Sequence, residues 1–145
     1  MWLISLFFSY INRQKLICLI NKIRSSWLKC QFKYLGNQSV IGKIGRLHGL
    51  KYISIGKNTT IQEFIFLTAW ETSEDGHTKN YPELTIGSNC NLGAFCHITC
   101  SNCITIGNNC LIGKNVTITD NSHGEISAEG VTLPRLKERS FLRGL

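Results

Sequence analysis

The chain has 145 residues, of which 43% are hydrophobic and 17% are charged. This composition excludes a disordered or collagen-like chain, and the length is that of one domain with its own core. The net charge is +7, but residues 1–62 hold ten Lys or Arg and no acid, whereas residues 63–145 hold six Lys or Arg and all nine acids. We expect the basic first half to contact an anionic partner: a membrane surface, a nucleic acid or a phosphorylated small molecule.

The cysteine count favours a reducing compartment. Seven cysteines cannot all pair within one chain, and their spacing is unlike a secreted disulfide framework, so a cytoplasmic location is the simpler interpretation. The apolar start at residues 1–11 lacks the basic flank and the cleavage site of a signal peptide. As a helix it is also too short to cross a hydrocarbon layer of about 30 Å.

Residues 1–36 are predicted to be a basic and apolar helical segment, because no Gly or Pro precedes Gly36. Apolar residues recur at three- and four-residue spacing at Leu16, Leu19, Ile20, Ile23 and Trp27. This stripe favours a helix that packs on the main body. The alternative is an amphipathic helix, with residues 1–33 making a peripheral contact with the inner face of an anionic membrane. Nucleic-acid binding is not expected, because no recognised motif accompanies the basic charge.

The sequence repeats with a period of six from Val40 to Asp120, and we assign the repeated segment to residues 37–123. The tetrapeptide Ile-Gly-x-Asn begins four times, at Ile55, Ile86, Ile106 and Ile112. A period of six fits neither a helix nor a hairpin, but it fits an all-β solenoid whose sharp corners Gly and Asn tolerate. Six aliphatic residues should then be buried: Ile86, Leu92, Ile98, Ile106, Ile112 and Ile118.

Two segments break the repeat. Residues 68–83 are predicted to be a loop insertion, because they are polar and contain Gly76 and Pro82. A loop that leaves a rigid scaffold is a common place for substrate contacts. Residues 124–145 lose the period as well, and we expect an irregular C-terminal tail.

The repeat accounts for most cysteines without a metal. Cys90, Cys96 and Cys110 occupy the small inward position of their hexapeptides, where Cys acts as a small hydrophobic residue. The pair Cys100 and Cys103 has the C-x-x-C spacing of zinc ligands, but the repeat points these side chains to different faces, so no metal site is expected.

The four histidines differ in their surroundings. His48 and His77 lie in irregular stretches, whereas His97 and His123 take the sixth hexapeptide position, which points outward at a corner. We expect His97 to be an exposed residue without a role. His123 is of more interest because it stands in Thr119–Gly124, where the repeat gives way to a loop.

The segment around His123 completes a signature that extends over about residues 40–139. It runs from Trp70 through Tyr81 and Pro82 and the Ile-Gly-x-Asn repeats to Asp120-Asn121-Ser122-His123-Gly124, followed by Pro134 and Arg139. This combination resembles the hexapeptide-repeat acyltransferases, the superfamily of the galactoside and maltose O-acetyltransferases. It is most similar to the branch that serves bacterial surface-polysaccharide synthesis.

The resemblance implies a left-handed parallel β-helix and an acetyl-CoA-dependent O-acetyltransferase that acts on a sugar hydroxyl, with His123 as the general base. Asp120, Asn121 and Glu125 would orient or support that imidazole, which suits base catalysis near neutral pH. Three residues of the insertion would contact the acceptor sugar: Trp70, His77 and Tyr81. Acetyl-CoA is the expected co-substrate, no metal is expected, and the residues that bind the coenzyme are not assigned.

The resemblance also implies a homotrimer with active sites between subunits. The enzymes it resembles continue with further repeats after the Pro and Arg segment, whereas this sequence stops soon after Arg139, so we expect a C-terminally truncated chain. The alternatives are a catalytically incomplete fragment or a non-enzymatic scaffold. An ice- or surface-binding solenoid is not favoured, because it would need a ladder of Thr-x-Thr, of which residues 117–119 are the only example.

Overall fold

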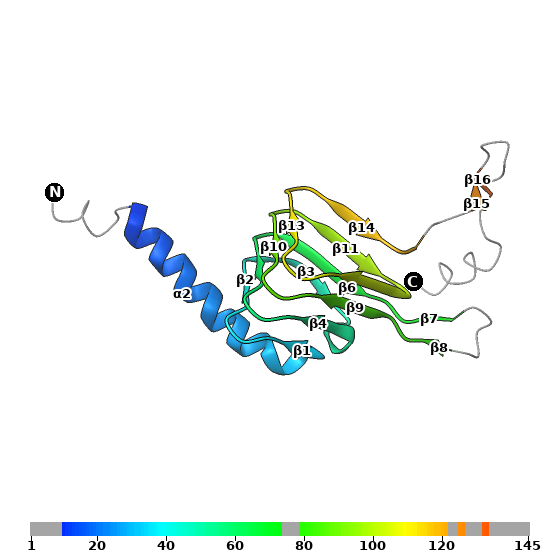
Figure 1. The fold of residues 1–145 in the computed structure, drawn as a ribbon, viewed down its shortest axis with the longest axis horizontal. Coiled ribbons are helices and arrows are strands. Elements are labelled where there is room, and N and C mark those ends of the chain that lie inside the picture. Colours follow the sequence, from blue (N-terminus) through cyan, green and yellow to red (C-terminus); the bar gives the residue numbers. More distant parts are fainter. Residues whose placement is uncertain (1–9, 74–78, 122–124, 127–131, 134–145) are drawn as a thin grey trace.

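In the part of the chain that the structure describes, one N-terminal helix precedes three parallel β-sheets of short strands, and two small antiparallel pairs of strands lie outside these sheets (Figure 1). The computed structural model describes residues 10–73, 79–121, 125–126 and 132–133. Helix α2 spans Tyr10–Leu28, and a 3-10 turn, η1, follows at Lys29–Gln31. This arrangement is compatible with a β-solenoid and agrees with the expected all-β body preceded by a helix.

Each parallel sheet contains four strands. Sheet A has the order β1 (Tyr34–Leu35), β4 (Ile53–Ile55), β9 (Glu83–Ile86) and β12 (Cys103–Ile106). Sheet B has the order β13 (Leu111–Ile112), β10 (Asn91–Leu92), β5 (Thr60–Ile61) and β2 (Val40–Ile41). Sheet C has the order β14 (Thr117–Thr119), β11 (His97–Cys100), β6 (Ile65–Ala69) and β3 (Ile44–His48).

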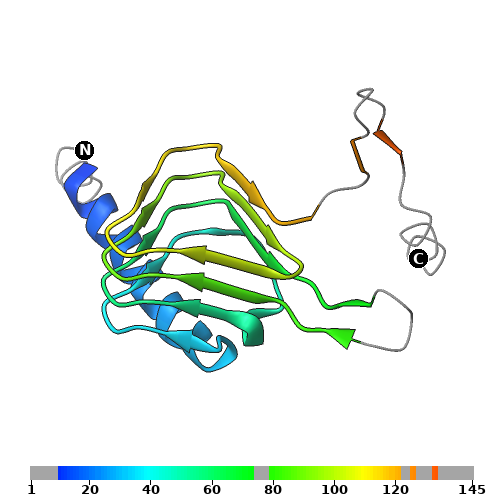
Figure 2. The same ribbon diagram turned by 45° about the vertical axis from the view of Figure 1, so that its right-hand side comes forward.

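The chain visits sheets A, B and C in turn, and it does so four times. We call each such passage a layer: layer 1 covers residues 34–48, layer 2 covers 53–69, layer 3 covers 83–100 and layer 4 covers 103–119. Figure 2 shows the layers stacked on one another, with α2 beside the stack. Layer 1 and layer 2 are joined by a second 3-10 turn, η2, at Leu50–Tyr52.

The core is a set of aliphatic columns in register across the layers. One column runs Leu35, Ile55, Ile86, Ile106; the second runs Ile41, Ile61, Leu92, Ile112; the third runs Leu47, Leu67, Ile98, Ile118. Within each layer these residues are six positions apart, which is the period of the sequence.

Four of the six aliphatic residues that we expected to be inside are buried, but Ile112 and Ile118 are only half-buried. Both belong to layer 4. Among the described residues, the strands of layer 4 pair with layer 3 on one side and with no strand on the other. The prediction of full burial was therefore wrong for these two residues, because layer 4 has a covering layer on one side only. Ile106, in the same layer, is the most exposed of the four buried residues, at 9%.

The corner chemistry of the repeat is also present. All four asparagines of the Ile-Gly-x-Asn motifs have positive φ angles, between 55° and 58°: Asn58, Asn89, Asn109 and Asn115. Asparagine adopts this left-handed conformation more readily than other non-glycine residues. Phe64 and Phe95 adopt it too, with φ of 57° and 61°, and their rings stack at 5.1 Å between centroids. The stacked rings offset part of the cost of a conformation that bulky residues rarely adopt.

Helix α2 contacts the body differently from our expectation. The stripe that we expected to pack on the body is exposed, and of residues 12–28 only Ser25 and Leu28 are buried. The Ser25 hydroxyl accepts a hydrogen bond from the Ile41 N–H of layer 1 at 2.8 Å. The prediction was wrong because the helix packs through the opposite side of its last turns. No helix in the described part of the chain is long and apolar enough to cross a membrane.

The insertion starts slightly later than the sequence indicates, because Thr68 and Ala69 continue β6 and pair with Thr99 and Cys100 of β11. Within it, β7 (Thr72–Ser73) and β8 (Lys79–Asn80) pair antiparallel. After layer 4, β15 (Glu125–Ile126) and β16 (Thr132–Leu133) form another antiparallel pair.

Candidate functional site

Four of the residues selected from the sequence lie where the chain passes from sheet C back to sheet A or leaves sheet C after layer 4. We call this edge of the stack the C–A corner: residues 49–52, 70–73, 79–82, 101–102 and 120–121. Trp70 and Tyr81 lie in the connection after layer 2, and Asp120 and Asn121 follow layer 4. Neighbouring strands are about 4.8 Å apart, so Trp70 and Asp120 are separated by two layers, or about 10 Å along the stack.

Trp70 is held firmly at this corner. Its ring stacks on the ring of His48 with centroids 3.8 Å apart and an angle of 21° between the planes. The Arg46 guanidinium lies 5.5 Å from the Trp70 ring centroid, within the range of a cation–π contact. The Trp70 backbone N–H donates to the Cys100 carbonyl at 2.8 Å. The indole is half-buried, so part of it stays accessible to a ligand.

A charged group lies beside the tryptophan. The Tyr52 hydroxyl donates a hydrogen bond to Glu71 Oε1, and the Lys51 ammonium lies 3.1 Å from the same oxygen. The hydrogen bond to Glu71 raises the pKa of Tyr52, and the hydrogen bonds with Tyr52 and Glu71 raise the pKa of Lys51, so both side chains stay protonated at neutral pH. Sequence analysis missed this group, because Lys51 and Tyr52 follow the irregular stretch after layer 1 and match no motif.

A shallow hollow of about 650 Å³ is lined by residues 47–52 and 69–71, which include this group, and by Gln31. Its size lies within the range of small-molecule sites. The hollow belongs to layers 1 and 2 and therefore does not include Asp120. Tyr81 is exposed, with its ring centroid 6.0 Å from that of Tyr52.

Asp120 binds the turn that follows layer 3, and we call this set of contacts the Asp120 clamp. Its two carboxylate oxygens accept hydrogen bonds from the Ser101 N–H at 2.7 Å and the Asn102 N–H at 2.8 Å. Partial burial opposes ionisation, but these N–H donors outweigh it and hold the pKa of Asp120 below its usual value. Asn121 continues the clamp, because its side-chain amide donates to the Ser101 hydroxyl at 3.1 Å. Asp120 is therefore an ionised carboxylate tied to the layer 3 turn, and its role toward His123 stays a prediction.

The thiol of Cys100 lies next to the Asp120 carboxylate. Burial, together with the nearby Asp120 carboxylate, raises the pKa of Cys100 to about 12. Its sulfur is 3.4 Å from Asp120 Oδ2 and 3.5 Å from the Glu83 carbonyl oxygen. A thiol in this environment stays protonated and is a poor nucleophile at neutral pH.

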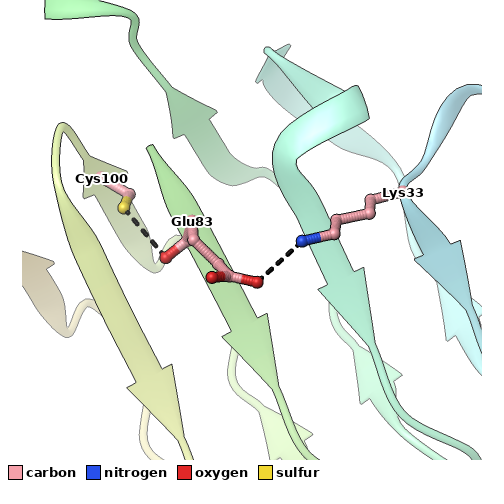
Figure 3. A network of polar contacts seen from close by, with 3 residues as sticks. All are labelled: Lys33, Glu83 and Cys100. Atoms are coloured by element: carbon pink, nitrogen blue, oxygen red, sulfur yellow. Dashed lines mark hydrogen bonds and ion pairs between the residues drawn. The ribbon is translucent and has the colours of Figure 1, made fainter. Parts of the chain in front are cut away.

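Glu83 connects the Cys100 thiol to the surface of sheet A (Figure 3). Its carboxylate accepts a hydrogen bond from the Lys33 ammonium at 2.7 Å, which lowers the pKa of Glu83. Both side chains are about half exposed, at 50% and 56%, so the pair adds little to stability.

Of the three cysteines predicted to point inward, Cys90 and Cys96 are buried and Cys110 is half-buried. The Cys90 and Cys96 thiols donate to the carbonyls of Gly107 and Gly113 at 3.1 and 3.0 Å, which places them in the interior between layers. Cys100 is buried whereas Cys103 is exposed, so the C-x-x-C pair does not converge. Within the residues that the structure describes, no group of three or more His, Cys, Asp or Glu is placed to hold a metal ion.

His97 is exposed, as the repeat predicts, and lies outside the C–A corner on the outer face of sheet C. Its Nε2 is 2.8 Å from the Thr99 hydroxyl, and its ring meets Phe66 edge-on at 5.5 Å. Two predicted site residues, His77 and His123, lie outside the described residues. For Glu125 the structure describes only the backbone, in β15.

Comparisons with protein-family models, with curated proteins and with solved structures found no match. The functional assignment therefore depends on the residues and the geometry of this chain. The feature that those residues share is the C–A corner, where a stacked tryptophan, a charged group and the start of the Asp-Asn-Ser-His-Gly segment occur on one edge of the layers.

Proposed function

We propose that the chain is a left-handed β-helix of hexapeptide repeats and an O-acetyltransferase that moves an acetyl group from acetyl-CoA to a sugar hydroxyl, with His123 as the general base. The observation that carries the proposal is the C–A corner. The insertion with Trp70 leaves the stack there, and Asp120 and Asn121 lead from the same edge into His123.

The repeat supports the proposed fold independently of the site. Residues six apart in the sequence fall into three columns across three parallel sheets, and the motif asparagines take the corner conformation. Such layers form a rigid support, on which loops can be held to the tolerance that catalysis needs.

The chemistry requires one base and an accessible thioester. A ring nitrogen of neutral His123 takes the proton of the sugar hydroxyl as its oxygen attacks the acetyl carbonyl carbon. The tetrahedral intermediate collapses with cleavage of the C–S bond, and the sulfur leaves as the coenzyme A thiolate, which receives the proton from the His123 imidazolium. The acetyl ester and the free thiol are the products. No cysteine nucleophile is needed, in keeping with the high pKa of Cys100, and direct transfer of this kind requires no metal ion.

Neighbouring residues supply binding and support. Asp120, Asn121 and Glu125 belong to the segment that would set the position and tautomer of the imidazole. The exposed part of the Trp70 indole would contact a sugar about 10 Å along the stack from Asp120, a span that a saccharide longer than one ring can bridge. Tyr81 lies on the same corner, and His77 belongs to the same insertion of the sequence; both would contact the acceptor.

The assembly and the location belong to this proposal as well. An anionic coenzyme would be attracted by the basic first half of the chain, in which Arg46 and Lys51 lie near Trp70. A homotrimer with sites between subunits, in the cytoplasm where acetyl-CoA is made, completes the proposal.

The test is release of free coenzyme A thiol from acetyl-CoA by the purified chain, followed with a thiol-reactive dye across a panel of mono- and oligosaccharides. The proposal expects release that depends on one class of saccharide, together with a mass increase of one acetyl group on that saccharide. No saccharide-dependent release at any pH between 6 and 9 would favour the alternative, a fragment or scaffold without activity.

A further inference from the structure

Helix α2 carries an apolar face that nothing in the described part of the chain covers. Its members are between 44% and 72% exposed: Leu16, Leu19, Ile20, Ile23 and Trp27. At about 100° per residue these side chains fall within an arc of roughly 100° on one side of the helix. We call them the α2 apolar face.

The helix is anchored so that this face points away from the body. Ser25 and Leu28, which are buried against layer 1, lie on the opposite side of the helix. The Ser25 hydroxyl donates to the Asn21 carbonyl at 2.7 Å and accepts from the Ile41 N–H, which fixes the last turns. Figure 1 shows the helix extending from the stack with its first turns far from any strand. A helix anchored in this way cannot bury its apolar face on its own layers without breaking the Ser25 contact.

Cationic side chains border the α2 apolar face on both edges. Lys15 and Lys22 lie along one edge, and Arg13 and Arg24 lie along the other. No acidic residue occurs anywhere in residues 1–62. An apolar strip between two rows of cations is suited to the boundary of an anionic bilayer, where the apolar side chains enter the acyl region and the cations reach the headgroups.

We propose that the α2 apolar face docks in the plane of an anionic lipid bilayer and holds the protein at the membrane surface. Four cations within 19 residues exclude a membrane-spanning orientation for this helix. A second copy of the helix is a poorer occupant, because packing two such faces together would bring their cationic edges side by side without an acid to pair with them. Residues 2–8 add six large apolar side chains and no charge to the sequence just before the helix. The proposal does not depend on acetyl transfer.

The experiment is co-sedimentation of the full chain with phosphatidylcholine vesicles that contain about 30 mol% phosphatidylglycerol or none. The proposal expects strong binding to the anionic vesicles, weak binding to the neutral ones, and loss of binding as NaCl rises toward 0.5 M. Replacing both Ile20→Gln and Ile23→Gln should weaken binding by more than about 100-fold, because two apolar side chains no longer enter the bilayer. Glutamine has a good helix propensity, and far-UV circular dichroism checks that the helix is kept.

The charge contribution has a matched control. The double variant Lys15→Gln with Lys22→Gln should weaken binding by about 30-fold. The double variant Lys57→Gln with Lys114→Gln removes the same net charge from exposed positions on the stack and should change binding by less than about threefold. Equal losses in the two pairs would overturn the proposal, as would binding that survives in the Ile20 and Ile23 variant.

Sedimentation velocity without lipid tests the competing occupant. If the wild-type chain self-associates and the Ile20 and Ile23 variant does not, the α2 apolar face is an interface between copies, and the membrane proposal is wrong. Neither measurement uses acetyl-CoA or a sugar. A failure of the membrane proposal can therefore be told apart from a failure of the proposed enzymatic function.

Discussion

Replacing the corner glycine with alanine should lower the free energy of unfolding in layer 3 but not in layer 4. Gly87 and Gly107 occupy equivalent corners of layers 3 and 4, and neither has a positive φ angle, so alanine fits the backbone of both. A Cβ on Gly87 would lie 2.6 Å from the backbone carbon and oxygen of Gly107, whereas a Cβ on Gly107 would meet no atom within 4 Å. The free-energy cost of the substitution therefore depends on whether another layer covers the glycine, and not on the backbone preference of alanine.

The magnitude follows from these contacts. Gly87→Ala must push two layers apart by several tenths of an ångström, an overpacking that costs about 1–3 kcal/mol. Both substitutions gain about 0.4–1 kcal/mol, because alanine restricts the unfolded chain. Gly87→Ala should thus lower the free energy of unfolding by about 1–2 kcal/mol, and Gly107→Ala should leave it unchanged or raise it by up to about 1 kcal/mol.

Urea unfolding followed by circular dichroism measures the difference. With a slope of about 2 kcal/mol per molar, the two variants should differ in midpoint by about 1 M urea, with equal slopes. Equal destabilisation by the two alanines would refute the reasoning, since it would mean that another layer covers Gly107 or that the register between layers 3 and 4 is wrong.

Three further predictions concern single contacts. Ser25→Ala should lower the free energy of unfolding by about 1–3 kcal/mol in urea titrations, because it leaves the buried Ile41 N–H without its acceptor; no change would contradict the anchoring of α2. Asp120→Asn should destabilise by about 1 kcal/mol at pH 7. Because the pKa of Asp120 is lowered on folding, the stabilisation by its carboxylate is present above pH 4 and is lost as the pH falls further. The difference in thermal unfolding between Asp120→Asn and the wild type should therefore shrink below pH 4. A difference that stays constant with pH would contradict this reasoning. In native-state alkylation analysed by mass spectrometry, Cys103 should react at least about tenfold faster than Cys100, and similar rates would argue against the burial of Cys100.

Much of the stack could be predicted from the sequence, because aliphatic residues, Gly and Asn recur at fixed positions of each six-residue repeat. The aliphatic residues of layers 2 to 4 fall into the columns that the hexapeptides predict, and the motif asparagines take the corner conformation. Layer 1 contributes Leu35 to the same columns, but it lacks an Ile-Gly-x-Asn motif, so our prediction placed the start of the repeated segment later.

The packing of α2 could not be predicted from its pattern. A stripe such as the α2 apolar face indicates that one side of a helix seeks an apolar environment, but it does not say whether a protein core, another chain or a lipid provides it. The structure anchors the opposite side through Ser25, a polar residue that pattern analysis does not count as a core position.

In the candidate site, too, the sequence indicated some residues but not the contacts between layers. Trp70 and Asp120 were selected from the sequence, and the structure puts both on the C–A corner. The His48 ring that stacks on Trp70 was not selected, because it comes from a different layer and pairs with Trp70 only through the register of β3 and β6. The clamp between Asp120 and the Ser101 turn was missed for the same reason, since it joins residues 19 positions apart.

The central claim is that His123 acts as the base in acetyl transfer, and the most direct measurement compares His123→Ala with His97→Ala. The sequence repeat assigns both histidines to the sixth position of a hexapeptide. The structure describes only His97, which lies on sheet C outside the C–A corner. With the saccharide that supports coenzyme A release, kcat/KM should fall by about 10²–10⁴-fold for His123→Ala and by less than about threefold for His97→Ala, while both variants unfold like the wild type. Small and equal effects of the two substitutions would contradict the assignment of the base.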